Sequence, residues 1–317
     1  MAKKYVKIAD TRKISKEEWI ELRKTGIGGS DAGAVVGLNP YASAYSVYHE
    51  KKSLVEPFEG NDKTRLGSDL EEYVAKRFEE ATGKKVRRMN AVLRSIERPY
   101  MIADVDRMIV GEDAGLECKT TANFDGYKFE EGEYPAQWAC QCYHYLSVTG
   151  AKRWDICVLD LTSGKVSIIQ IERNQSEITA LEDMEGAFWT EYIEKDICPA
   201  PNGSERCDDI IAEKYPEADD DAPTLDLMGY SKELERLAEV KAQIKPLEDE
   251  KKALEQALKE ALGVASTGEY GLYKVTYKNS TSTRLDTAKL KAEMPNIYAA
   301  YANESTSRRF LFTVSKK

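Results

Sequence analysis

An acid and a base stand two residues apart in the segment GLECKT, residues 115–120. Side chains of a β-strand alternate between its two faces, so Glu117 and Lys119 would project together while the residues beside them point into the packing. Asp106, delivered by the preceding strand, would complete an oxygen-rich site of the kind that magnesium binds. The cluster therefore predicts metal-assisted phosphodiester hydrolysis, although an acid–x–lysine spacing taken alone favours an ordinary surface ion pair.

Each member of this cluster has a distinct expected role. Asp106 and Glu117 would bridge one ion, with the backbone carbonyl of Cys118 as a third protein ligand. Lys119 would lie beside the attacking water, where it helps to orient or activate the water and balances charge on the phosphate. Glu71, early in the helix that RLGSDLEE begins, would complete or bridge a second metal position. A solvated helix acid is the alternative for Glu71.

Three further polar positions predict contacts to phosphate or water. Gln137 and Gln141 are one helical turn apart and can hold a water or a phosphate oxygen, although an ordinary polar helix face fits them equally. The glycines of residues 26–37 do not form a dinucleotide loop or a P-loop, because a helix precedes them and no Gly-Lys-Ser/Thr follows. Small residues that begin a helix can still present amides and the Ser30 hydroxyl to a phosphate, and Arg23 can add a guanidinium contact.

The elements that must position these residues alternate between helices and strands. Capping signals and apolar spacing predict helices over residues 15–24, 69–83 and 135–150. Short apolar or alternating segments predict neighbouring strands over 91–96, 100–110 and 115–120, and a hairpin over 153–172. The proline- and acid-rich stretch YPEADDDAPT predicts a linker. We therefore expect one domain over residues 1–222 and a smaller one over 223–317.

The smaller domain is predicted to contain a long helix with a coiled-coil-like stripe. Apolar residues from Leu237 to Ala261 are spaced by alternating threes and fours. Pro246 should kink or split this helix near residue 242. Two strands, at 271–279 and 308–317, are expected around a helix at 286–302. Two interpretations of the stripe fit equally well: a contact with another subunit or partner, or packing of the helix on its own domain.

The composition excludes several classes of protein. Hydrophobic residues make up 42 % and charged residues 32 % of the 317-residue chain, which excludes general disorder. The apolar runs are shorter than the roughly 20 residues of a membrane helix, and the lysine-rich start has no apolar segment of a signal peptide, so we expect a cytoplasmic protein. Six cysteines without a CxxC pattern predict free thiols. The net charge of −9 argues against a protein that binds nucleic acids over its whole surface. Basic residues are nevertheless clustered in the N-terminal segment that contains Arg23 and next to the strand at 91–96.

Taken together, these motifs resemble the YqaJ-type phage recombination nucleases, relatives of phage lambda exonuclease in the PD-(D/E)XK restriction-endonuclease-like superfamily. The resemblance covers roughly residues 15–195 and is carried by WIELRKTGIGGSDAGAVVGLNPYAS, LGSDLEEYVAKRFEEATGKKV, ADVDRMIVGEDAGLECKT and AQWACQCYHYLSVTG. It implies an α/β fold with a mixed central sheet flanked by helices, plus a smaller α+β C-terminal extension with a coiled-coil-like helix.

The resemblance also implies roles for the site residues. Arg23 and Ser30 correspond to the pair that binds the DNA 5′ phosphate. The metal ligands correspond to Glu71, Asp106 and Glu117, the catalytic lysine to Lys119, and the helix glutamine to Gln141, with Gln137 in reserve. The usual proline before the motif aspartate is replaced by Val105. Asp104 adds a carboxylate that is either a further ligand or a group already satisfied by its neighbours.

By resemblance, the activity is a magnesium-dependent deoxyribonuclease, with manganese able to substitute. It would degrade linear double-stranded DNA from 5′ ends, leaving 3′ single strands for an annealing protein of the RecT or Beta type. A ring-shaped homo-oligomer would make digestion processive. The protein would be encoded by a phage or prophage and act in the cytoplasm of the bacterial host, not at a membrane. The alternatives are an endonuclease of the same fold and a catalytically idle DNA-end-binding assembly protein.

Overall fold

The computed structural model describes residues 4–55, 60–122, 128–219, 221–304 and 307–314. The chain divides into two compact units, Met1–Tyr215 and Pro216–Lys317. The predicted boundary between residues 222 and 223 therefore lies just inside the second unit.

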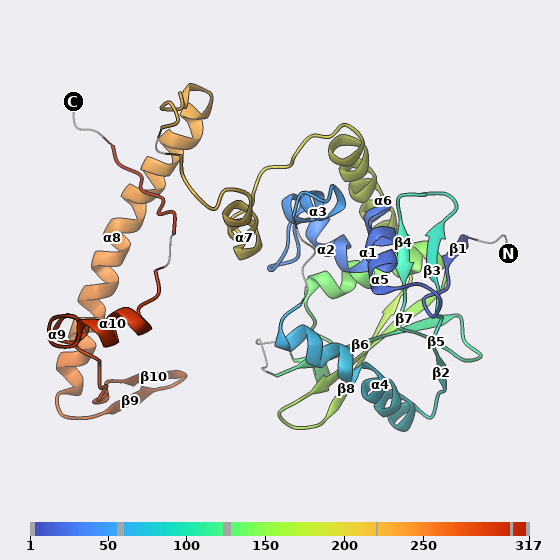
Figure 1. Cartoon of the computed structure of the whole chain (residues 1–317). Coiled ribbons are helices and arrows are strands. Elements are labelled where there is room, and N and C mark those ends of the chain that lie inside the picture. The colour runs from blue at the N-terminus through green and yellow to red at the C-terminus, as the bar shows by residue number, and fades with distance from the viewer. Residues whose placement is uncertain (1–3, 56–59, 123–127, 220, 305–306, 315–317) are drawn as a thin grey trace. The chain divides into compact units, whose positions relative to one another are not determined.

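A five-stranded sheet forms the centre of the first unit (Figure 1). Its strands run in the order β2 (Val86–Arg87), β5 (Arg107–Ile109), β6 (Ala114–Thr121), β7 (Arg153–Asp160) and β8 (Val166–Glu172). β6 and β7 are parallel and the other neighbours are antiparallel. A parallel pair needs a crossover, which α5 (Ala136–Thr149) supplies between Pro135 and Gly150 as predicted. The predicted mixed central sheet flanked by helices is confirmed.

Opposite faces of this sheet pack against different helices. Leu116 of β6 is fully buried in a cluster with Val74 and Phe78 of α4 (Asp62–Thr82). On the other face, Trp154 packs in the cluster that contains Leu146 of α5. The alternation of β6 therefore directs its odd-numbered residues, among them Glu117 and Lys119, toward the α5 face.

A second, three-stranded antiparallel sheet contains β1 (Tyr5–Ala9), β3 (Val92–Ser95) and β4 (Ile102–Asp104). The prediction of one strand over 100–110 was wrong, because the chain leaves β4 at Val105 and begins β5 at Arg107 in the other sheet. At the break, the carboxylate of Asp106 accepts the backbone N–H of Cys118 at 2.9 Å. A side chain thus takes the donor that a continued strand would have paired with its backbone.

α1 (Lys16–Lys24) and α5 begin and end where the sequence predicts, whereas α4 only ends there. α1 starts with the predicted capping box of Ser15 and Glu18. α4 starts earlier than predicted, at Asp62, and ends at Gly83, whose φ of 72° is easily adopted by glycine. The remaining helical segments of the first unit are α2 (Gly29–Val35), α3 (Ala44–Lys51), η1 (Phe129–Glu131), α6 (Gln175–Phe188), η2 (Trp189–Glu194) and α7 (Glu205–Lys214).

The second unit contains η3 (Met228–Tyr230), α8 (Ser231–Leu262), α9 (Thr287–Glu293), α10 (Pro295–Tyr301) and a hairpin of β9 (Thr267–Tyr270) and β10 (Tyr273–Thr276). α8 continues through Pro246, so the predicted split was wrong: the lost backbone donor is tolerated within a 32-residue helix. The predicted helix over 286–302 is interrupted before Pro295, which starts α10.

The second unit has little core of its own. The prediction of a strand over 308–317 was also wrong, since the described residues 307–314 form no strand. Residues 315–317 lie outside the described part. Each residue described after Tyr215 is at least partly exposed, including Leu237, Ile244 and Leu254 of the predicted stripe. Across the described ranges of both units, no helix combines the length and apolarity needed to cross a membrane.

Candidate active site

Glu117, Lys119 and Gln141 form a hydrogen-bonded triad between β6 and α5. The Lys119 ammonium donates to Glu117 Oε1 at 2.7 Å and to Gln141 Oε1 at 2.8 Å. The Gln141 amide donates to the same Glu117 oxygen at 2.7 Å and to the Tyr145 hydroxyl at 3.0 Å. The prediction that Glu117 and Lys119 share a face is confirmed. Burial alone would lower the pKa of Lys119, but the Glu117 carboxylate outweighs it and raises that pKa, so the ammonium stays charged.

Asp106 and Glu117 carry more negative charge than their surroundings balance. Burial, and then the nearby charges of Glu117 and Glu71, raise the pKa of Asp106. The Glu117 side chain is only about 5 % exposed, and its Oε2 is buried without a hydrogen-bond partner among the described residues. A buried carboxylate oxygen that lacks a donor is costly. A divalent cation would satisfy both groups, so the donor set fits a metal with oxygen ligands.

The backbone of Cys118 faces the same place. Among the described residues, β5 pairs with β6 through Arg107–Leu116 and Met108–Gly115, and this pairing does not extend to Cys118. The N–H and C=O of one strand residue point to the same side. Because the N–H of Cys118 reaches Asp106, its carbonyl also points away from β7, as the predicted ligand role requires.

Glu71 is held by an arginine that the sequence analysis did not single out. The Arg107 guanidinium, only 3 % exposed, donates to Glu71 Oε1 at 2.5 Å and to the backbone carbonyl of Asp106 at 2.8 Å. It also donates to Glu72, which Arg88 contacts at 2.6 Å. As these side chains stand, the described residues contain no cluster of three or more acids, histidines or cysteines close enough to hold a metal ion. A charged residue next to Asp106 in an otherwise apolar strand was the available signal for Arg107.

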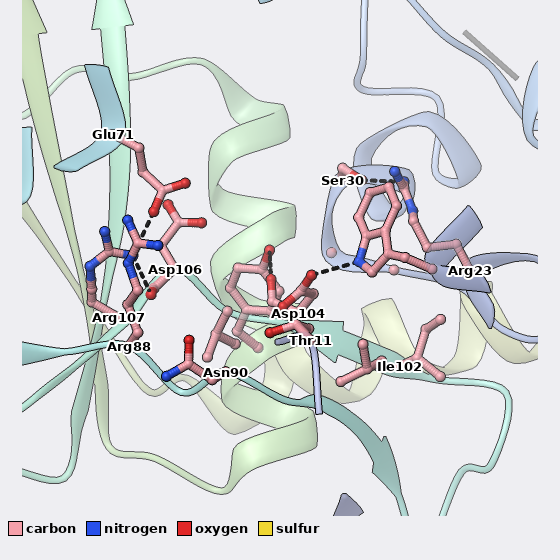
Figure 2. A pocket seen from close by; sticks show the side chains of 16 residues that line it. Thr11, Arg23, Ser30, Glu71, Arg88, Asn90, Ile102, Asp104, Asp106 and Arg107 are labelled. Carbon is pink, nitrogen blue, oxygen red and sulfur yellow. Dashed lines mark hydrogen bonds and ion pairs between the residues drawn. The ribbon is translucent and has the colours of Figure 1, made fainter. Parts of the chain in front are cut away.

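One cleft of about 380 Å³ joins the acids to the predicted phosphate contacts (Figure 2). Glu71 and Asp106 line one end of it, and Arg23 and Ser30 line the other, with Asp104 between them (Figure 2). The sequence thus predicted residues of both ends. Gln137 is not among the lining residues: it packs against Gly33 of α2, where a Cβ would lie 2.7 Å from the Gln137 Cβ.

The basic end of the cleft is assembled from α1 and α2. The Arg23 guanidinium donates to Ser30 Oγ at 2.9 Å and lies 4.9 Å from the centre of the Trp19 ring. The Trp19 indole N–H donates to Asp104 at 2.8 Å. Asp104 therefore has a partner of its own, while burial raises its pKa. Trp19 and Asp104 were not predicted as parts of a phosphate site.

The mixed sheet thus carries Glu117 and Lys119 on one face of β6, with the glutamine of α5 packed across them. Residues 18–152 match the YqaJ-like viral recombinase domain. The protein YqaJ of Bacillus subtilis (strain 168) is 35 % identical over 306 residues, which is 96 % of each chain. This chain belongs to the YqaJ-like viral recombinase family, and the similarity extends through the second unit.

Other proteins are similar over shorter stretches or in shape. Protein D345L of African swine fever virus (strain Badajoz 1971 Vero-adapted) is 42 % identical over 45 residues, 14 % of this chain and 13 % of that one. The alkaline exonuclease LHK-Exo of Laribacter hongkongensis is 19 % identical and superimposes with a TM-score of 0.47 over 57 % of this chain and 94 % of its own. A phage-related exonuclease of Haemophilus somnus 129PT is 12 % identical, with a TM-score of 0.43 over 56 % and 99 %.

Proposed function

We propose that this protein is a metal-dependent deoxyribonuclease of recombination that hydrolyses linear double-stranded DNA in the 5′-to-3′ direction and leaves 3′ single strands. The observation that carries the proposal is the state of the Glu117 carboxylate. One oxygen is held by Lys119 and Gln141, and the other is buried without a donor among the described residues, while the charge of Glu117 acts on nearby Asp106. Such an arrangement is costly in a folded protein unless a cation completes it.

Magnesium is the proposed metal, with manganese as a substitute, because the ligands are oxygens. Asp106, Glu117 and the Cys118 carbonyl would hold it, and Glu71 would complete the site after exchanging its contact with Arg107. When bound, the ion would polarise the phosphate and favour deprotonation of water. Of these ligands, Glu71 and Asp106 line the cleft, whereas Glu117 and Cys118 do not line it and are linked to Asp106 by charge and by a hydrogen bond.

The protein's own side chains have defined tasks in this proposal. Lys119, kept protonated by Glu117, would donate hydrogen bonds to the reacting phosphate and stabilise the charge that develops on it. Gln141 fixes the positions of both Glu117 and Lys119 through its two charged contacts. Lys119 does not need to act as a general base in this proposal. Its raised pKa would make it a poor base at neutral pH.

The basic end of the cleft supports cleavage from a strand end. Arg23 and Ser30 would bind the terminal 5′ phosphate by charge-assisted hydrogen bonds. An anchor in the same cleft as the acids restricts the reaction to bonds near that end. The family's description as a viral recombinase supports a role in recombination. From the resemblance to phage nucleases we further propose a phage or prophage origin, a bacterial cytoplasmic site of action, transfer of the 3′ strand to an annealing protein of the RecT or Beta type, and a ring-shaped homo-oligomer around the DNA.

The test compares linear duplex DNA with covalently closed circular DNA, each with and without magnesium. We expect loss of the linear DNA alone, only with the metal, and release of label from 5′ ends before 3′ ends. Lys119→Ala should abolish the loss, whereas Lys165→Ala, at an exposed lysine between β7 and β8, should not. Cutting of the circle would favour an endonuclease. No cutting of either DNA with magnesium or manganese, together with retained end binding, would reduce the protein to an end-binding assembly factor.

A further inference from the structure

A buried ion pair lies directly behind Arg23 and Ser30. Asp31, 7 % exposed, accepts from the Lys51 ammonium at 2.6 Å and from the Arg23 guanidinium at 3.3 Å. It also accepts the backbone N–H of Gly28 at 2.9 Å, which fixes the turn between α1 and α2. Asp31 and Lys51 do not line the cleft, whereas Arg23 and Ser30 do.

Lys51 of α3 contacts the backbone of Arg23 directly and its guanidinium through Asp31. Its side chain is 5 % exposed, and its ammonium donates to the backbone carbonyl of Arg23 at 2.8 Å as well as to Asp31. Arg23 is thus held at its backbone by Lys51 and at its guanidinium by Asp31 and Ser30. A planar guanidinium held at one nitrogen still has other N–H groups to offer to an anion.

The charges of this group determine what Arg23 can bind. Burial would raise the pKa of Asp31, but Lys51 and Arg23 lower it to about 2, so the carboxylate is ionised. An ionised carboxylate beside Arg23 alone would cancel the charge that a phosphate needs. Lys51 balances that carboxylate, and the group of three keeps a net charge of one positive unit at Arg23.

We propose that Asp31 and Lys51 are positioning residues that hold Arg23 in place and leave its positive charge available to a terminal phosphate. The inference rests on the proposed function, since it takes the anion to be the 5′ phosphate of a DNA strand. Neither residue touches the phosphate in this proposal. Their effect passes through Arg23.

The charge argument separates this role from simple stabilisation of the fold. Lys51→Met leaves Asp31 to neutralise Arg23, so phosphate recognition should be lost. Adding Asp31→Asn to Lys51→Met removes the competing carboxylate and should restore part of the recognition. Replacing both partners of a buried ion pair is often tolerated, whereas removing one is not. A purely structural pair would make phosphate recognition follow thermal stability, whereas the charge of Asp31 predicts that recognition is lost even in a Lys51→Met protein that remains folded.

The experiment measures equilibrium binding of the full-length protein to two duplexes by fluorescence anisotropy, in EDTA so that no hydrolysis occurs. One duplex carries 5′ phosphates and the other 5′ hydroxyls, and the quantity of interest is the ratio of their dissociation constants. A charged hydrogen bond contributes roughly 1.5–3 kcal/mol, which corresponds to a preference of about 10- to 150-fold. Thermal unfolding of each variant checks its fold, and Lys52→Met, at the end of the same helix, is the matched control.

We expect the phosphate preference to fall to near one in Arg23→Ala and Lys51→Met, to recover at least threefold in the double variant and to be unchanged in Lys52→Met. A folded Lys51→Met protein with the wild-type preference would overturn the proposal. If Lys51→Met does not fold, the double variant decides: a preference as low as that of Arg23→Ala overturns it. A wild-type protein that ignores the 5′ phosphate but still hydrolyses linear DNA would overturn this inference and leave the nuclease proposal intact.

Discussion

The replacement Gln141→Leu tests the triad that joins α5 to β6. Gln141 is 9 % exposed and makes two contacts to charged groups, one to Lys119 at 2.8 Å and one to Glu117 at 2.7 Å. Leucine has a similar volume but can make neither contact. Lys119 and Glu117 keep each other at 2.7 Å, so the change loosens the pair without separating it.

The expected size of the effect follows from these contacts. Loss of one effective charged hydrogen bond corresponds to roughly 1.5–3 kcal/mol, or a rate reduction of about 10- to 150-fold. Because Gln141 does not line the cleft, DNA affinity in EDTA should change less than about twofold. The rate should therefore fall while binding is retained.

The assay is single-turnover hydrolysis of an end-labelled linear duplex with protein and magnesium in excess. Gln137→Leu is the matched control, since it removes the same amide one turn earlier on α5, outside the cleft lining. The reasoning is refuted if Gln141→Leu cuts at the wild-type rate, or if Gln137→Leu is the slower of the two. Either result would mean that the triad does not set the position of Lys119.

Three further predictions concern stability. Burial and neighbouring acids raise the pKa of Asp106, so ionisation of this group destabilises the folded state at neutral pH, and the destabilisation disappears as pH falls. In EDTA at pH 7, Asp106→Asn should therefore unfold at a higher temperature than the wild type, and it should lose activity. Gly115→Ala places a Cβ 2.3 Å from the Trp154 ring and should lower the free energy of unfolding in urea by about 1–3 kcal/mol. Burial would lower the pKa of His144, but Glu185 raises it overall. The protonated His144 therefore contributes its full stabilisation below about pH 6.5, and this stabilisation is lost as pH rises through the pKa of the folded state. Denaturant titrations should show that the free energy of unfolding falls less between pH 6 and pH 8 in Glu185→Gln than in the wild type.

The sequence predicted what depends on neighbours along the chain. The capping box at Ser15, the glycine after α4 and the hairpin turn at Gly164 are local signals, and each is found where expected. The same alternation that buries Leu116 against α4 correctly placed Glu117 on the opposite face of β6, toward α5. These features need only backbone geometry and apolar spacing.

The sequence could not predict contacts between distant segments. Glu71 meets Arg107 across 36 positions of the chain, and the break in the strand before Arg107 exists because Asp106 bonds to Cys118, 12 positions later. Apolar spacing carries no information about such polar contacts. In the second unit, the apolar stripe of α8 predicted a helix but not its partner, and its leucines remain exposed.

The two ends of the cleft place opposite demands on a DNA strand. In the proposed mechanism the acids at Asp106 and Glu117 repel phosphate, while Arg23 and Lys119 attract it. Of these four residues, Asp106 and Arg23 line the cleft of about 380 Å³. Without a cation, only the basic end favours the strand, so the terminal phosphate should bind there first. Neutralising the acid end then removes the repulsion on the next phosphate along the strand. Since such coupling is reciprocal, a DNA end held by Arg23 also favours a cation at Asp106. In this proposal an acidic protein can act on a polyanion, because recognition of the end and completion of the acidic site would support each other.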